Sequence, residues 1–179
     1  NEKVNTPREV QNITNAKSVV WGNTNSTPGI AVAILKDGKV MRWGSSIGSV
    51  PVEVSWLDWP NEKAVQTQAT GNGSDNLLVL LDNGRIKVSP SNHAWVDGGA
   101  DSSTDYLIPG LTNIIQIENG THSMYALGSD GAVYSWGYQS TGDEHLGRAG
   151  LQVNTNHPVG QVDGIGPGSG AIKIVTNNR

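Results

Sequence analysis

The sequence predicts an all-β fold built from repeated antiparallel sheets, and three observations support this. First, 68 of the 179 residues are Gly, Asn, Ser or Thr, a composition that favours turns and strands over helices. Second, three segments share one pattern, an apolar run, then Asp-Gly or Asn-Gly, then a second β-prone run. Third, the glycines of these pairs, Gly38, Gly84 and Gly131, are spaced 46 and 47 residues apart. We therefore expect three copies of one structural unit within a single domain, residues 1–179.

Each repeated pair predicts a β-hairpin. Asp37-Gly38, Asn83-Gly84 and Asp130-Gly131 join two apolar runs through two residues that tolerate positive φ. This is typical of a tight type I′ turn, with the glycines as the structural turn residues. The first arms are expected at residues 30–35, 77–81 and 123–127, and the second arms at 40–43, 86–88 and 133–136.

Two further strands complete each unit. An apolar lead strand precedes each hairpin, and an outer strand follows it at Pro51, Asp105 or Pro158. A proline at the start of a strand suits an edge position, where a full ladder is not needed. Four antiparallel strands with a period of about 46–47 residues have the size of a β-propeller blade.

The predicted blades leave a propeller incomplete. The expected ranges are an outer strand of a preceding blade (7–13), blade 1 (17–57), blade 2 (64–111), blade 3 (114–165) and a lead strand of a next blade (171–176). Three blades cannot close a ring, and uncovered blade faces are apolar. We expect self-association, or the remainder of a longer propeller, to cover them.

The third copy resembles a known repeat. Residues 117–127, the Trp136-Gly137 pair and residues 145–148 are similar to the repeat of the regulator of chromosome condensation family. That repeat combines His-Ser, Asp-Gly, Trp-Gly and Gln-Leu-Gly; the first copy matches it partly and the second poorly. The resemblance implies a propeller, normally of seven blades. It does not imply one function, because these propellers serve as exchange factors, enzyme inhibitors, photoreceptors and adhesion modules.

Composition and charge exclude several classes of function. The net charge is −4, the chain has no cysteine, and no run is basic enough to bind nucleic acid or apolar enough to insert into a membrane. The absence of cysteine excludes disulfides, thiolate metal sites and a cysteine nucleophile. An acidic, cysteine-free chain rich in Asn, Thr, Ser and Gly is compatible with an extracellular or bacterial cell-surface location.

No catalytic constellation is evident, so we expect neither enzymatic activity nor a cofactor. His122 could act as a base beside Ser123, but no residue to orient it can be assigned. The resemblance instead implies a structural His-Ser pair, with the histidine buried between blades. The loop of residues 92–105 spaces Asp97, Asp101 and Asp105 by four, whereas a calcium loop alternates its ligands. A solvated polar loop is the preferred interpretation, and no metal site is expected.

The candidate ligand-binding residues lie in two predicted loops. Trp59 and Asp58 lie in the link between the first and second blades. Trp56, in the same link, could fill the gap between these blades rather than bind a ligand. His93, Trp95 and Asp97 lie in the loop after the second hairpin. Tryptophan beside a carboxylate is a common means of gripping a sugar or anchoring a protein. The sequence therefore predicts a non-enzymatic binding or adhesion module for a protein or glycan partner. The alternative is a regulatory propeller, either a GTPase exchange factor or an enzyme inhibitor.

Overall fold

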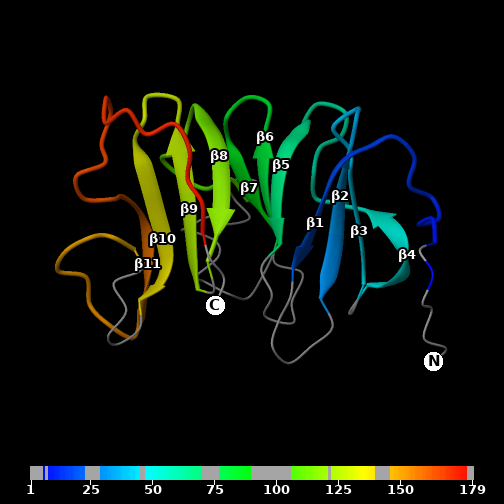
Figure 1. The fold of residues 1–179 in the computed structure, drawn as a ribbon, viewed down its shortest axis with the longest axis horizontal. Coiled ribbons are helices and arrows are strands. Elements are labelled where there is room, and N and C mark those ends of the chain that lie inside the picture. The colour runs from blue at the N-terminus through cyan, green and yellow to red at the C-terminus, as the bar shows by residue number, and fades with distance from the viewer. Residues whose placement is uncertain are drawn as a thin grey trace.

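A computed structural model describes residues 6, 8–22, 29–44, 47–69, 77–89, 106–120, 122–139 and 146–176. Across these ranges the chain forms three antiparallel sheets and no helix (Figure 1), which confirms the all-β class. The first sheet has the order β1-β2-β3-β4. Its strands are β1 (Ala16–Gly22), β2 (Ile30–Leu35), β3 (Val40–Gly44) and β4 (Gly48–Glu53).

The second and third sheets repeat this arrangement. The second has the order β5-β6-β7, with β5 (Ala64–Ala69), β6 (Leu77–Leu81) and β7 (Ile86–Val88). The third has the order β11-β10-β9-β8. It contains β8 (Ile114–Asn119), β9 (Ser123–Gly128), β10 (Val133–Gln139) and β11 (Thr155–Gln161). The lead strands β1, β5 and β8 are each an edge strand of their own sheet.

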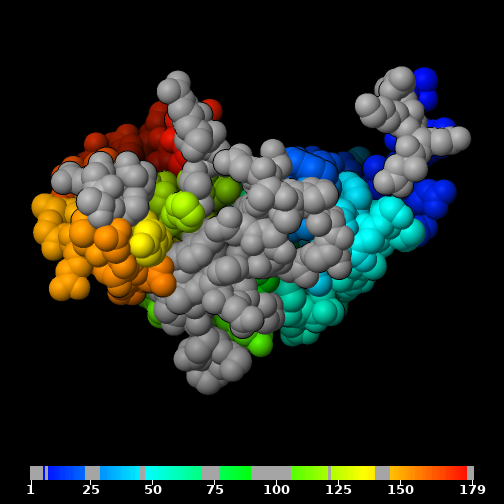
Figure 2. All heavy atoms as spheres, turned by 90° about the horizontal axis from the view of Figure 1, so that it is seen from below, coloured from blue at the N-terminus to red at the C-terminus, as the bar shows by residue number. Residues whose placement is uncertain are grey.

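The sheets stand in a row and share two apolar layers. Figure 2 shows the order along the chain, with blue and cyan segments at one end, green between them, and orange and red at the other. One layer joins the first sheet to the second through residues such as Ile34, Val40 and Val79. The other joins the second sheet to the third through residues such as Leu80, Ile117 and Trp136. Each sheet is thus buried by its neighbours in sequence, as expected for a repeat protein.

The hairpin turns differ from the predicted type I′ turns. Each loop has three residues: Gly38 N donates to Leu35 O at 2.9 Å, and Leu35 N donates to Lys39 O at 2.8 Å. The same two bonds recur around Gly84 and Gly131. Within each loop only the glycine has positive φ, the pattern of a type I turn followed by a glycine bulge. Asp37, like its counterparts in the other turns, instead uses its side chain to bind the backbone two residues on.

The predicted outer strand of the second blade is reduced to a single bridge, between Lys87 and Leu107. Ile108 N donates to Ile86 O at 2.9 Å and Val88 N donates to Tyr106 O at 3.0 Å. Tyr106 has a φ of 57°, which takes the chain out of the extended conformation. Among the described residues the second sheet therefore has three strands and this bridge, so the predicted fourth strand does not form over residues 106–111.

The two flanking strands and the positions of the strand prolines also differ from the prediction. Residues 8–13 of the predicted outer strand 7–13 form no ladder, and Asn12 turns the chain with a φ of 60°. Residues 171–176 form no ladder either, although side chains of the third sheet hold them in place. Pro51 and Pro158 lie inside β4 and β11 rather than at their starts. Both strands are edge strands, where proline is tolerated.

Candidate functional site

The segment between β4 and β5, residues 54–63, carries two of the candidate ligand-binding residues. It lies at the end of the strands that carries the hairpin turns. Directly after the segment, Ala64 N donates to Gly38 O, in the first hairpin turn, at 3.0 Å. Asp58 is exposed and Trp59 is half-buried. The structure therefore brings this predicted pair together on one loop.

A compact turn, residues 58–62, holds this pair; we call it the 58–62 turn. Glu62 N donates to Asp58 O at 2.9 Å. In return, Asp58 N donates to Glu62 Oε2 at 2.8 Å, and Asn61 Nδ2 donates to Asp58 Oδ2 at 3.2 Å. The Trp59–Pro60 peptide bond is cis. These reciprocal bonds fix the backbone that presents Trp59.

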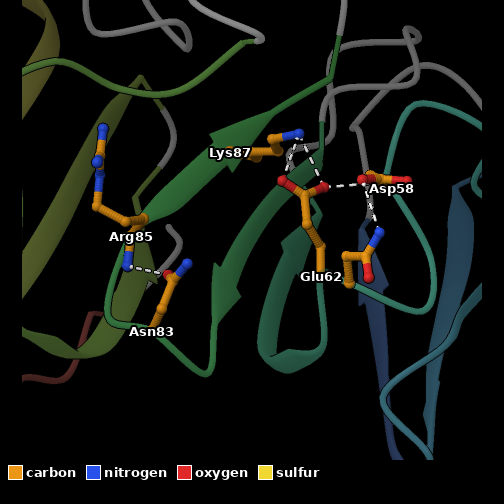
Figure 3. Close-up of polar contacts among 6 residues, drawn as sticks. Asp58, Glu62, Asn83, Arg85 and Lys87 are labelled. Carbon is orange, nitrogen blue, oxygen red and sulfur yellow. Dashed lines mark hydrogen bonds and ion pairs between the residues drawn. The ribbon is translucent and has the colours of Figure 1, made fainter.

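A buried lysine anchors the 58–62 turn to the second sheet (Figure 3). Lys87 Nζ lies 2.6 Å from Glu62 Oε1 and 2.8 Å from Glu62 Oε2. The Lys87 side chain is 0% exposed and that of Glu62 is 17% exposed. Breaking such a pair by removing one partner costs roughly 3–5 kcal/mol, because a buried charge is left uncompensated. The turn is thus held more firmly than a surface loop.

Sequence reasoning missed this ion pair, although a signal was present. Lys87 occupies the β7 position that matches Met41 in β3 and Tyr134 in β10. In the second and third sheets this side chain points toward the preceding sheet, so a charge at this position predicts an acidic partner on the link before it. Only the fold identifies that partner as Glu62.

A cation covers one side of Trp59. Lys39 Nζ lies 5.6 Å from the ring centroid, within the range of a cation–π contact. The same ammonium pairs with Glu53 at 2.9 Å. Both side chains are partly exposed, so this ion pair contributes little to stability. It does place charges of both signs near the aromatic ring, Lys39 over it and Glu53 on Lys39, while Asp58 directly precedes Trp59 in the chain.

Trp56 has a different role from Trp59. It is half-buried and packs against the apolar layer between the first and second sheets. This confirms the interpretation of Trp56 as a filler of the gap between blades. Its Nε1 is buried and makes no hydrogen bond to the described residues.

The other candidates, His93, Trp95 and Asp97, lie outside the described residues. The flanking residues Ser89 and Tyr106 lie at the end of the second sheet where β6 begins. Ser89 N donates to Leu77 O, and Val88 N donates to Tyr106 O. The 58–62 turn lies at the opposite end of the strands, because Ala64, shortly after it, pairs with Leu81.

His122 departs from its expected burial. Its side chain is exposed, whereas Ser123 is buried, and its ring packs edge-on against Tyr138 with centroids 6.2 Å apart. The expectation of a histidine buried between blades is therefore wrong. His122 precedes β9, so it lies outside the alternation that buries alternate strand residues.

Neither a metal site nor a membrane-spanning helix is found in the described ranges. Within them, no three His, Asp or Glu side chains gather closely enough to hold a metal ion. The acidic loop of residues 92–105 lies outside these ranges. In the same part of the chain, no helix has the length and apolar character needed to cross a membrane.

Comparisons with known proteins identify the fold. No family model matches the sequence. Over 123 residues the chain is 30% identical to Protein pim1 of Schizosaccharomyces pombe, a match that covers 69% of this chain and 16% of the relative. The chain thus spans only a small part of that protein's length.

Two solved structures are similar to the described sheets. Human WBSCR16 aligns with a TM-score of 0.64 at 18% identity, over 87% of this chain and 40% of that one. The crystal structure of Kap60 bound to yeast RCC1 (Prp20) contains a chain that aligns with a TM-score of 0.62 at 17% identity, over 84% of this chain and 37% of that one. The fold is therefore that of an incomplete propeller with RCC1-like neighbours, whose three sheets are successive blades without a closed ring.

Proposed function

We propose that this chain is part of a propeller of the RCC1 type that binds a protein partner through the 58–62 turn and carries out no catalysis. The observation that carries the proposal is the anchoring of Trp59 and Asp58 by the buried Lys87–Glu62 pair. A pre-ordered aromatic side chain loses little conformational entropy on binding, which favours its use as an anchor. The proposal includes the extracellular or bacterial-surface location that the composition favours.

A protein partner suits the turn better than a glycan does. A sugar ring stacks on an open aromatic face, and Lys39 Nζ, 5.6 Å from the Trp59 ring centroid, occupies one of the two faces. The nearby charges are of both signs, since Lys39 pairs with Glu53 and Asp58 is exposed. Such an arrangement complements a peptide segment that carries both an apolar and a charged side chain. The crystal structure with Kap60 shows that a propeller-containing relative can bind a protein.

The proposal is tested by selecting binders from a phage-displayed random peptide library on the wild-type chain. Peptides that bind the 58–62 turn should lose at least about tenfold in affinity when Trp59→Ala removes the aromatic anchor. Asp58→Asn should weaken the same peptides less, because an exposed charge contributes little to affinity. Affinities are measured by titration calorimetry on the purified variants.

Trp21→Ala provides the matched control, because Trp21 is 61% exposed and lies in β1, away from the turn. The selected peptides should bind this variant as tightly as the wild type. If no peptide is enriched, or if every enriched peptide binds Trp59→Ala unchanged, protein binding by the turn is wrong. Binding to a glycan array that depends on Trp59 would instead establish the glycan function.

A further inference from the structure

Asn83 and Gly84 form an Asn-Gly pair in the turn of the second hairpin. The sequence contains three such pairs, at residues 72–73, 83–84 and 119–120. Asparagine is a chemically labile residue, and a following glycine leaves the next backbone nitrogen unshielded by a Cβ, so that it can attack the side-chain amide. Residues 72–73 lie outside the described residues, so the structure compares the other two pairs.

The Asn83 side chain is exposed and its amide carbonyl is polarised (Figure 3). Its Oδ1 accepts a hydrogen bond from Arg85 N at 3.0 Å. This bond closes a small ring that contains both Asn83 Cγ and Gly84 N, the two atoms that the attack joins. A backbone N–H on Oδ1 also stabilises the negative charge that develops there during the attack. Among the described residues, Asn83 Nδ2 has no hydrogen-bond partner, so the leaving group is unrestrained.

Asn119 precedes a glycine too, but its setting is the opposite. It is 9% exposed, and its Nδ2 donates to Ala69 O at 3.3 Å across the interface between the second and third blades. Gly120 N, the nucleophile of this pair, donates to Ser123 O at 2.7 Å. The leaving group and the nucleophile are therefore both held, and the leaving group is buried.

A single hydrogen bond restrains the nucleophile of the first pair. Gly84 N donates to Leu81 O at 3.0 Å within the turn. Attack requires this bond to open and the nitrogen to lose its proton, so the reaction is promoted by base. Opening the tip of a hairpin is a local fluctuation that leaves the sheets assembled. The pair in the second hairpin can therefore react while the protein stays folded.

We propose that Asn83 is a site of spontaneous deamidation in the folded protein. Gly84 N loses its proton to solvent and bonds to Asn83 Cγ, the Cγ–Nδ2 bond breaks, and ammonia is released. Water then opens the resulting succinimide at either of its two carbonyl carbons, which gives aspartate or isoaspartate at position 83. The reaction needs no reagent besides water. It also does not depend on the binding role proposed for the 58–62 turn.

The two products should differ in their effect on the fold. Asp37 and Asp130 hold the same position in the other hairpins, and each accepts a bond from the backbone two residues on. Aspartate at position 83 therefore fits the turn. Isoaspartate inserts an extra main-chain atom before Gly84, where a built Cβ would already lie 2.9 Å from Asn113 Cα. This product should weaken the contact between the second and third blades.

The test is incubation of the full chain at mildly alkaline pH, followed by mass spectrometry of the peptides that contain residues 83 and 119. The folded chain should lose the Asn83 amide at least about tenfold faster than the Asn119 amide. In denaturant the two amides should be lost at similar rates, because both then precede glycine in an open chain. Reaction through global unfolding would expose both alike, so the ratio reports on the folded state. Equal rates in the folded chain overturn the proposal, as does an Asn83 amide that survives while the unfolded chain reacts.

A matched variant tests the consequence for stability. Asn83→Asp supplies the first product directly and should unfold at the same denaturant concentration as the wild type. The isoaspartate form, isolated from aged protein by ion exchange and identified by isoaspartyl methylation, should unfold at a lower concentration than Asn83→Asp. An isoaspartate form as stable as Asn83→Asp overturns the predicted damage to the interface.

Discussion

Single glycines set the geometry of the hairpin turns. Gly84 has a φ of 74°, and a Cβ built on it would lie 2.9 Å from Asn113 Cα and 3.0 Å from Asn113 N. Two separate constraints therefore act on this residue, left-handed backbone strain and close approach to the next blade. Gly110 has the same φ of 74° but nothing within 4 Å of a built Cβ.

This pair of glycines separates the two constraints. Gly110→Ala should destabilise the fold by about 1–2 kcal/mol through backbone strain alone. Gly84→Ala should cost at least about 1 kcal/mol more, because the Asn113 backbone cannot move without shifting β8. Denaturant unfolding of both variants measures the difference. Equal losses of stability would show that the close approach has no energetic weight.

At the scale of elements, the lead strands join the blades through side chains as well as through apolar contact. In β5, the Gln66 side chain donates to Ile117 O and accepts from Ile117 N, an arrangement we call a clasp. Gln116 in β8 makes the same two bonds with Ile174, whereas β1 has Ser18 at the matching position. Serine is too short to reach both backbone groups of a residue on the next strand. Thr67, which lies where the first blade would clasp, has a buried Oγ1 without a hydrogen-bond partner among the described residues. The interface between the first and second blades therefore has fewer polar contacts at this position.

The clasp predicts opposite effects for two substitutions. Gln66→Leu should destabilise the protein by about 1–3 kcal/mol, because it leaves the Ile117 N–H without its partner in a buried interface, while the Ile117 C=O keeps the bond from Gln68 Nε2. Ser18→Gln should stabilise it by about 1 kcal/mol through a third clasp on β5. Thermal melts of the two variants and the wild type give the order. A Gln66→Leu variant that melts like the wild type would contradict an energetic role for the clasp.

At the scale of the whole molecule, stability is divided between two apolar layers. Ile34 belongs to the layer between the first and second blades, and Ile117 to the layer between the second and third. Both side chains are 0% exposed. Because each layer involves only neighbouring blades, the two ends of the row should open separately.

Matched isoleucine truncations test this division. Ile117→Ala and Ile34→Ala should each destabilise their own layer by roughly 2–5 kcal/mol. Amide hydrogen exchange should then quicken mainly in β8–β11 for the first variant and in β1–β4 for the second. A uniform increase across the three sheets in both variants would show that the row unfolds as one unit.

Features that depend on neighbouring residues were predictable from the sequence. The spacing of Gly38, Gly84 and Gly131 predicted the three hairpins, because the left-handed residue of such a turn favours glycine wherever the turn lies. The Gly, Asn, Ser and Thr content and the repeated hairpin pattern predicted the all-β class, and Trp59 beside Asp58 marked the exposed link. These signals are local, so one chain suffices to read them.

Contacts between residues far apart in the sequence became visible only in the fold. The Lys87–Glu62 pair spans 25 residues and the Gln66–Ile117 clasp spans 51. The loss of the second outer strand rests on the backbone turn at Tyr106, which the run of apolar residues did not indicate. Period and composition specify which face of a strand is buried, but the partner of a buried polar group depends on how neighbouring blades pack. For this reason the candidate turn was found from the sequence, and its anchor was found only in the fold.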